Sequence, residues 1–111
     1  MTPDRFPEKV DFITTPGYLE GGDSRQKAGL IGGPIAVVTQ VGVFDFDPVS
    51  KRMRIKGLNP GMTVEIAQMC AGFELLVPEQ IESIPAPSDE VLTVLREEVD
   101  PRRVFTKMPG M

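Results

Sequence analysis

The chain has 111 residues, 41% hydrophobic and 25% charged, which is the ordinary balance of a single globular domain. Its formal net charge of −4 argues against a nucleic-acid partner, because basic patches dominate the affinity of proteins for nucleic acids. It contains no histidine and one cysteine, which excludes an intrachain disulfide, a Ser-His-Asp triad and most zinc sites.

The first third of the chain predicts one strand and one long loop. Residues 1–8 are largely polar and are expected to form an arm. Residues 9–15 are rich in β-branched and aromatic side chains, which predicts a strand that ends at Pro16-Gly17. Residues 18–33 hold five glycines and predict a loop, and loops of this length usually carry a function or are disordered.

The next segments predict a sheet. Residues 34–39 form a short apolar run, which is typical of a strand covered on both faces and suggests the interior of a parallel sheet. Polar and apolar residues alternate on either side of a four-residue turn, which predicts a β-hairpin over residues 43–56.

The alternation of polar and apolar residues in this hairpin predicts its register. One register makes one face wholly apolar and pairs opposite charges on the other, whereas a slip by one residue sets Phe against Arg. The predicted pairs are Asp47–Arg52, Phe46–Met53, Asp45–Arg54 and Phe44–Ile55. We therefore interpret Asp45 and Asp47 as partners of arginines rather than as metal ligands.

A helix is predicted after the turn at Pro60-Gly61. Thr63 is placed to cap its N-terminus, and Gly72 is placed to end it in the left-handed conformation. The expected apolar stripe consists of Ile66, Met69, Cys70 and Phe73, widened by Val64, Ala67 and Ala71. We interpret Cys70 as a small buried hydrophobe, because no histidine is present to activate its thiol.

The remaining segments predict a short strand over residues 73–77, a loop over 78–87 and a second helix. Ser88 is expected to cap this helix and Asp100-Pro101 to stop it. Its apolar face consists of Val91, Leu92, Leu95 and Val99. Residues 102–111 are expected to form a second arm, and we interpret its basic residues, Arg102, Arg103 and Lys107, as solvated rather than as phosphate ligands.

The glycine-rich loop holds the candidate binding residues of this chain. Gly21 and Gly22 could let backbone amides approach an anion, and Arg25 and Lys27 could add positive charge. The alternative is a plain surface connection, which the sequence favours because the loop lacks the Lys-Ser ending of a phosphate-binding loop. Gly21, Gly22 and Arg25 are the predicted cofactor-binding residues, and no catalytic or metal-binding residue is predicted.

Four motifs together carry a resemblance to a known family. They are Gly32-Gly33-Pro34-Ile35-Ala36-Val37-Val38-Thr39, Gly42-Val43-Phe44-Asp45-Phe46-Asp47, Asn59-Pro60-Gly61-Met62-Thr63-Val64 and Ala71-Gly72-Phe73-Glu74-Leu75. The chain resembles the second half of the B subunit of the glutaconate/3-oxoadipate-type coenzyme A transferases over roughly residues 6–105. Members of that family usually carry a histidine where this chain has Asn59.

The resemblance implies an α/β fold in which helices flank the sheet, in an enzyme built from paired A and B subunits. It implies transfer of coenzyme A between an acyl-CoA and a carboxylic acid, with coenzyme A as a substrate and no permanently bound cofactor. The catalytic glutamate of the family belongs to a Ser-Glu-Asn/Gly-type motif upstream of the matched part. Glu20 follows Leu19 rather than serine, so we interpret it as a solvated carboxylate.

The chain is therefore expected to be one domain, residues 1–111, that is inactive alone. Its expected partners are an N-terminal B-type segment that carries the glutamate, together with an A-type subunit. Two alternatives stay open, a noncatalytic assembly domain and part of a related hydrolase that opens a ring in acyl-CoA intermediates. No signal peptide is visible and no apolar run approaches the ~20 residues that span a bilayer, so we expect a cytoplasmic protein without a membrane partner.

Overall fold

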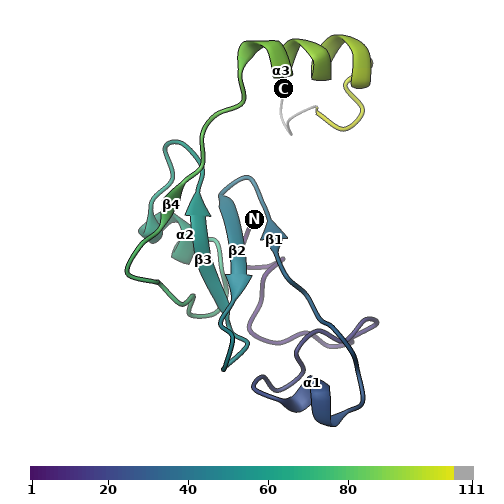
Figure 1. Cartoon of the computed structure of the whole chain (residues 1–111), viewed down its shortest axis with the longest axis vertical. Helices are drawn as coiled ribbons and strands as arrows, with labels where there is room; N and C mark the ends of the chain where they lie inside the picture. The colour runs from purple at the N-terminus through teal and green to yellow at the C-terminus, as the bar shows by residue number, and fades with distance from the viewer. Residues whose placement is uncertain (107–111) are drawn as a thin grey trace.

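The computed structural model describes residues 1–106, which form a four-stranded sheet and three short helices (Figure 1). The strands are β1 (Val37–Val38), β2 (Gly42–Phe46), β3 (Met53–Leu58) and β4 (Glu82–Ser83). The helices are α1 (Ser24–Lys27), α2 (Val64–Met69) and α3 (Asp89–Val94), and α3 continues as a π-helical segment, η1 (Leu95–Val99). The sheet order is β1-β2-β3-β4, with β4 parallel to β3 and the other neighbours antiparallel.

The predicted hairpin and its register are confirmed in β2 and β3. Phe46 lies opposite Met53, Asp45 opposite Arg54 and Phe44 opposite Ile55. At the turn, the amide of Asp47 donates to the carbonyl of Arg52 at 2.9 Å. A bulge after Val43 then shifts the register, so that Val43 faces Gly57 rather than Lys56. The predicted charge pair between the side chains of Asp47 and Arg52 is wrong, because the Arg52 guanidinium donates instead to the carbonyl of Glu74 at 3.1 Å.

The core lies between the apolar face of the hairpin and α2. Phe44 and Ile55 are fully buried, and they pack with Val41, Ala67, Ala71 and Leu75. The predicted cap of α2 is confirmed, since the Thr63 hydroxyl accepts from the amide of Ile66 at 3.2 Å. Cys70 is half-buried against this core. The α/β fold with a helix-flanked sheet is thus confirmed.

The predicted apolar face of α2 is rotated in the structure. Ala67 and Ala71 are buried, whereas Met69 is 75% exposed. Small side chains face the sheet because they let the helix backbone approach it closely. The left-handed end predicted at Gly72 is also wrong, since this residue is not among those with positive φ. Gly72 instead lets the N-terminal arm approach, and its amide donates to the carbonyl of Phe6 at 2.7 Å.

Three predicted strand segments differ from the structure. Residues 9–15 form no strand, and Phe12 is 80% exposed, because no neighbouring strand pairs with this segment. Residues 34–39 contribute only the two-residue β1 at the edge of the antiparallel part of the sheet, not the interior of a parallel one. Residues 73–77 contribute a single bridge, in which Leu76 pairs with Arg54. The loop predicted over 78–87 contains β4.

The second predicted helix is confirmed, but it lies away from the sheet. Ser88 caps α3 by accepting from the amide of Val91 at 3.3 Å. Figure 1 shows α3 at the end of an extended connector, well separated from β1–β4. After the helix the buried carboxylate of Asp100 accepts from the amides of Val104, Phe105 and Thr106, which holds residues 102–106 in a tight turn. The rest of the expected C-terminal arm, residues 107–111 with Lys107, lies outside the described residues.

Candidate functional site

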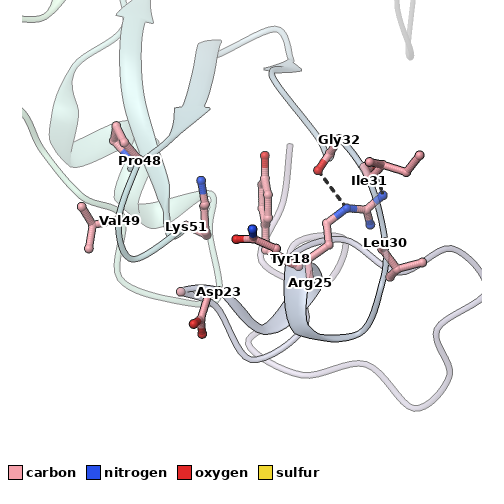
Figure 2. Close-up of a pocket in the computed structure, with 11 residues that line it drawn as sticks. Tyr18, Asp23, Arg25, Leu30, Ile31, Gly32, Pro48, Val49 and Lys51 are labelled. Atoms are coloured by element: carbon pink, nitrogen blue, oxygen red, sulfur yellow. Dashed lines mark hydrogen bonds between the residues drawn. The ribbon is translucent and has the colours of Figure 1, made fainter.

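A pocket opens between the glycine-rich loop and the turn of the β2–β3 hairpin (Figure 2). Its volume is about 710 Å³. The loop contributes Tyr18, Gly22, Asp23, Arg25, Gln26, Leu30, Ile31 and Gly32, and the hairpin turn contributes Pro48, Val49 and Lys51. Two segments that are far apart in the sequence therefore form one concave surface.

The hairpin turn is shaped by Asp47. Its carboxylate accepts from the amides of Val49 and Ser50, at 3.1 and 2.7 Å, and from the Ser50 hydroxyl at 3.0 Å. These bonds, first among them the one from the Ser50 amide, hold the pKa of Asp47 below its usual value. The turn closes with Lys51 in the left-handed region at φ 61°. Asp47 is therefore a turn-forming residue in this chain.

The two glycines of the loop lie against this turn. The amide of Gly22 donates to the carbonyl of Ser50 at 2.9 Å. Gly21 has φ 90°, and a Cβ atom at this position would lie 2.8 Å from the same carbonyl oxygen. A side chain at position 21 would hence push the loop off the hairpin. The contact with Ser50 therefore explains glycine at position 21, and the left-handed backbone of Gly22, at φ 55°, favours glycine at position 22.

Arg25 ties the two ends of the loop together. Its guanidinium donates to the carbonyls of Pro16, Gly17, Ile31 and Gly32, at distances of 2.8 to 3.1 Å. Figure 2 shows the side chain directed toward Ile31 and Gly32. None of the four acceptors is a carboxylate, so the positive charge of Arg25 is not neutralised by these bonds.

Tyr18 forms the wall between the loop and the sheet. Its hydroxyl donates to the carbonyl of Pro34, and its ring meets Phe46 edge to face with 5.0 Å between the ring centroids. The Lys51 ammonium lies 5.5 Å from the Tyr18 ring centroid. Lys51 forms no ion pair among residues 1–106. The sequence analysis missed both residues, although Tyr18 is the only tyrosine of the chain.

The structure brings two of the three predicted binding residues to this pocket. Gly22 and Arg25 line it, and Gly21 precedes Gly22 at the hairpin contact. The amides of Gly21 and Gly22 already donate to the carbonyls of Tyr18 and Ser50. The binding role of these three residues stays a prediction. Lys27 lies outside the pocket lining and pairs with Asp23 at 3.4 Å on the surface.

Three carboxylates outside the pocket differ in their surroundings: Asp45 and Asp100 are hydrogen-bonded, and Glu20 is exposed. Asp45 is bonded to Arg54, and the hydrogen bond from that guanidinium holds its pKa below the usual value. Burial opposes ionisation of Asp100, but bonds from the Thr106 amide and its neighbours outweigh it, and the pKa of Asp100 is also lowered. Glu20 is exposed, on the rim of a separate open hollow. It therefore lacks the dry surroundings that a nucleophilic carboxylate needs.

Asn59 stands at the start of the Asn59-Pro60-Gly61 turn, where members of the resembled family usually carry a histidine. Its side-chain amide donates to the carbonyl of Gln40 at 2.9 Å, and its backbone amide donates to the carbonyl of Val41 at 3.0 Å. The residue thus fastens the turn after β3 to the turn before β2. Within residues 1–106 no group of three or more potential metal ligands lies together, and no helix there is long and apolar enough to cross a bilayer.

The chain is similar to several proteins of known name. It is 37% identical to the B subunit of glutaconate CoA-transferase of Acidaminococcus fermentans over 107 residues, which are 95% of this chain and 40% of that protein. It is 35% identical to the B subunit of 3-oxoadipate CoA-transferase of Pseudomonas knackmussii, over 82% of this chain and 35% of that protein. It is 31% identical to the cholesterol ring-cleaving hydrolase IpdB subunit of Mycobacterium tuberculosis, over 87% of this chain and 38% of that protein.

The fold comparison agrees with the sequence comparison. The crystal structure of glutaconate coenzyme A-transferase from Acidaminococcus fermentans superimposes with a TM-score of 0.86 at 34% identity, covering 97% of this chain and 42% of that one. No protein-family profile matches the chain. The chain spans about two fifths of the length of the curated relatives it matches.

Proposed function

We propose that this chain, which is homologous to part of the B subunit of the glutaconate and 3-oxoadipate CoA-transferases, supplies the framework of a CoA-transferring enzyme whose reactive carboxylate comes from another segment. The homology over 95% of the chain is the observation that carries the proposal. In this proposal the chain corresponds to the second half of such a B-type polypeptide. An N-terminal B-type segment and a separate A-type subunit complete a cytoplasmic hetero-oligomer.

The proposed reaction requires a glutamate nucleophile, which in this proposal is carried by the N-terminal B-type segment. A glutamate carboxylate attacks the acyl-CoA thioester, releases the CoA thiolate and leaves an acyl-glutamyl anhydride. The thiolate then attacks the glutamyl carbonyl, which releases the first acid and leaves a glutamyl-CoA thioester for the second acid. The carboxylate oxygens of Asp45, Asp47 and Asp100 are occupied by hydrogen bonds that hold the hairpin, its turn and the C-terminal turn. These three carboxylates therefore have structural partners, which supports a nucleophile on another segment.

The pocket contributes an anion-binding wall to the assembled enzyme. Arg25 keeps an uncompensated positive charge there, and Lys51 adds an ammonium group. Gly21 lets the loop pack closely on the hairpin, and the Gly22 amide bonds to the Ser50 carbonyl, so that these two cations come to one concave surface. The phosphates of coenzyme A are the anions that this wall receives.

Two other functions are compatible with the same scaffold. One is part of an acyl-CoA ring-opening hydrolase, which the similarity to the ring-cleaving hydrolase supports at lower identity. The other is a noncatalytic assembly domain, in which the same scaffold serves only to hold subunits together. The reaction of the assembled complex with an acyl-CoA distinguishes the three functions: a transferase moves the CoA to another acid, a hydrolase opens the ring of its acyl-CoA, and an assembly domain does neither.

Reconstitution tests the proposal. The chain is co-expressed with the A subunit of the Acidaminococcus fermentans enzyme and with the part of its B subunit that lies outside the match, and CoA transfer between an acyl-CoA and glutaconate is measured. Transfer that requires all three polypeptides, with the covalent CoA adduct on the complementary part, is the expected result. A complex that forms but transfers CoA to no acid would favour the assembly domain. An adduct on this chain alone would overturn the proposal.

A further inference from the structure

We propose that α3 and η1 form a docking helix, whose apolar face binds the polypeptide that supplies the rest of the B subunit. This inference rests on the proposed function for the identity of the occupant. The argument for the docking itself comes from the exposure, length, position and charge of residues 89–99.

The helix carries an apolar face that is exposed in the part of the chain that the structure describes. Val91 is 56% exposed, Val94 41% and Val99 69%. With Glu90 and Leu95 they line a shallow hollow of about 350 Å³. The opposite side is charged, so the helix has the amphipathic pattern of a surface helix whose apolar side should lie on a core.

Its own sheet does not cover this face. The substantial contacts of α3 are with η1, and Figure 1 shows both at the far end of the connector that follows β4. Pro85 and Pro87 lie in this connector. Because proline fixes φ and removes a hydrogen-bond donor, the connector is stiff and extended. The helix is thus held away from the sheet by its connector.

A helix of this length is not stable by itself. The segment contains the six residues of α3 and the five of η1, and helices shorter than about 12 residues are marginal in water even with favourable sequences. Yet both of its ends are defined. Ser88 caps the start, and after the end the Asp100 carboxylate binds the three following amides of residues 104–106. Caps alone do not stabilise so short a helix, because most helical stability in proteins comes from packing of the amphipathic face.

The size of the exposed surface indicates a large partner. The chain exposes 8758 Å², whereas a compact monomer of its mass exposes roughly 6,000 Å². Its radius of gyration is 16.5 Å, against about 13 Å for a compact domain of this length. The excess of about 2,700 Å² exceeds the ~800 Å² that each protein buries in a standard interface. The remaining three fifths or so of the B subunit is an occupant of the required size.

The charges on residues 89–99 indicate which charges the rim of the partner's groove should carry. Residues 89–99 hold four acidic side chains, Asp89, Glu90, Glu97 and Glu98, and one basic side chain, Arg96. An apolar groove bordered by lysine or arginine is the complement of this helix. The other exposed apolar side chains of the chain, such as Phe12 and Ile35, add to the area that the same polypeptide covers.

Hydrogen exchange on the isolated full chain gives the first test. Because the sheet does not cover α3 within residues 1–106, its amides should exchange at least about 100-fold faster than those of Phe44 and Ile55. They should become protected when the chain is co-purified with the complementary part of the Acidaminococcus fermentans B subunit. Amides of α3 that are as protected as the hairpin in the isolated chain would overturn the inference.

A matched pair of charge substitutions gives the second test. Val94→Asp places a carboxylate in the docking face, and Thr93→Asp places the same group one residue away, outside the apolar hollow. Val94→Asp should reduce recovery of the complementary part about tenfold or more, whereas Thr93→Asp should leave it unchanged. Both variants should melt like the unmodified chain, because both positions are exposed.

The outcomes separate this inference from the proposed function. Equal recovery with both variants, or no recovery with the unmodified chain, would overturn the docking helix. CoA transfer by a complex that Val94→Asp leaves intact would overturn the docking helix and retain the transferase. A complex that Val94→Asp disrupts but that transfers no CoA would retain the docking helix and overturn the transferase.

Discussion

Arg54 and Asp45 face each other across the β2–β3 hairpin and form a bidentate ion pair. Nε of Arg54 donates to Oδ1 of Asp45 at 2.9 Å, and Nη2 donates to Oδ2 at 2.8 Å. On the opposite face of the same two strands, Phe44 lies against Ile55 in the core. A shift of one residue would break both pairs at once, so the two faces specify the same register.

The ion pair predicts how stability depends on pH. The hydrogen bond from Arg54 lowers the pKa of Asp45 in the folded state. Its stabilising contribution is therefore complete above the unfolded aspartate pKa of about 3.9, and is lost as the pH falls through the lower folded value. Asp45→Asn should reduce the free energy of unfolding at pH 7 and should flatten its decline below pH 4. Urea denaturation from pH 2 to 7 measures both, and an unchanged slope in the variant would contradict the prediction.

Gly21 should be sensitive to a side chain because of a contact, and Gly29 provides the control. Both have positive φ, at 90° and 80°, but only at Gly21 would a Cβ atom approach another group, the Ser50 carbonyl at 2.8 Å. Gly29→Ala should cost about 1 kcal/mol through backbone strain alone. Gly21→Ala should cost about 1–3 kcal/mol more, because the loop must leave the hairpin. Equal losses in urea denaturation would show that the contact does not matter.

Arg25 should order the loop through the shape of its guanidinium. A lysine keeps the charge but lacks the planar fork that reaches four carbonyls. Arg25→Lys should therefore cost about 1–3 kcal/mol and make residues 16–33 more susceptible to limited proteolysis. Lys27→Ala is the control, because its ion pair with Asp23 is exposed, and it should change stability by less than about 0.5 kcal/mol. A loop that stays protected in Arg25→Lys would refute this role.

Lys51 should affect substrate binding more than stability. Its ammonium group faces the pocket beside Tyr18, and Lys51→Gln removes the charge while keeping a polar side chain that is one atom shorter. In the reconstituted enzyme this variant should raise KM for acyl-CoA about three- to thirtyfold and leave kcat nearly unchanged. Lys27→Gln, outside the pocket lining, should leave both constants unchanged. A KM that does not respond to Lys51→Gln would remove this pocket from the proposed CoA contact.

The parts of the fold that local chemistry determines could be predicted from the sequence. The hairpin register, and the caps at Thr63 and Ser88, depend on neighbouring residues and are confirmed. The strand expected over residues 9–15 is wrong because strand propensity does not provide a partner strand. The position of β1 at an edge likewise depends on sheet order, which periodicity does not encode.

The candidate site shows the same division. Composition drew attention to Gly21, Gly22 and Arg25, but the need for glycine at position 21 comes from a contact with Ser50, which is distant in the sequence. The Tyr18–Lys51 approach depends on how the loop packs on the hairpin. Such contacts between distant segments are set by tertiary packing, so residue patterns alone do not reveal them.

The face of α2 that meets the core is the last testable difference between pattern and structure. Helical spacing favoured Met69 for the core, whereas the structure buries Ala67 and leaves Met69 75% exposed. Met69→Ala should therefore change the free energy of unfolding by less than about 0.5 kcal/mol. Ala67→Leu should lower it by about 1–3 kcal/mol, because the added atoms have no space between α2 and the hairpin. If Met69→Ala were the more damaging change in urea denaturation, the helix would present the larger side chains to the sheet, and the close approach that places Ala67 and Ala71 against the hairpin would be wrong.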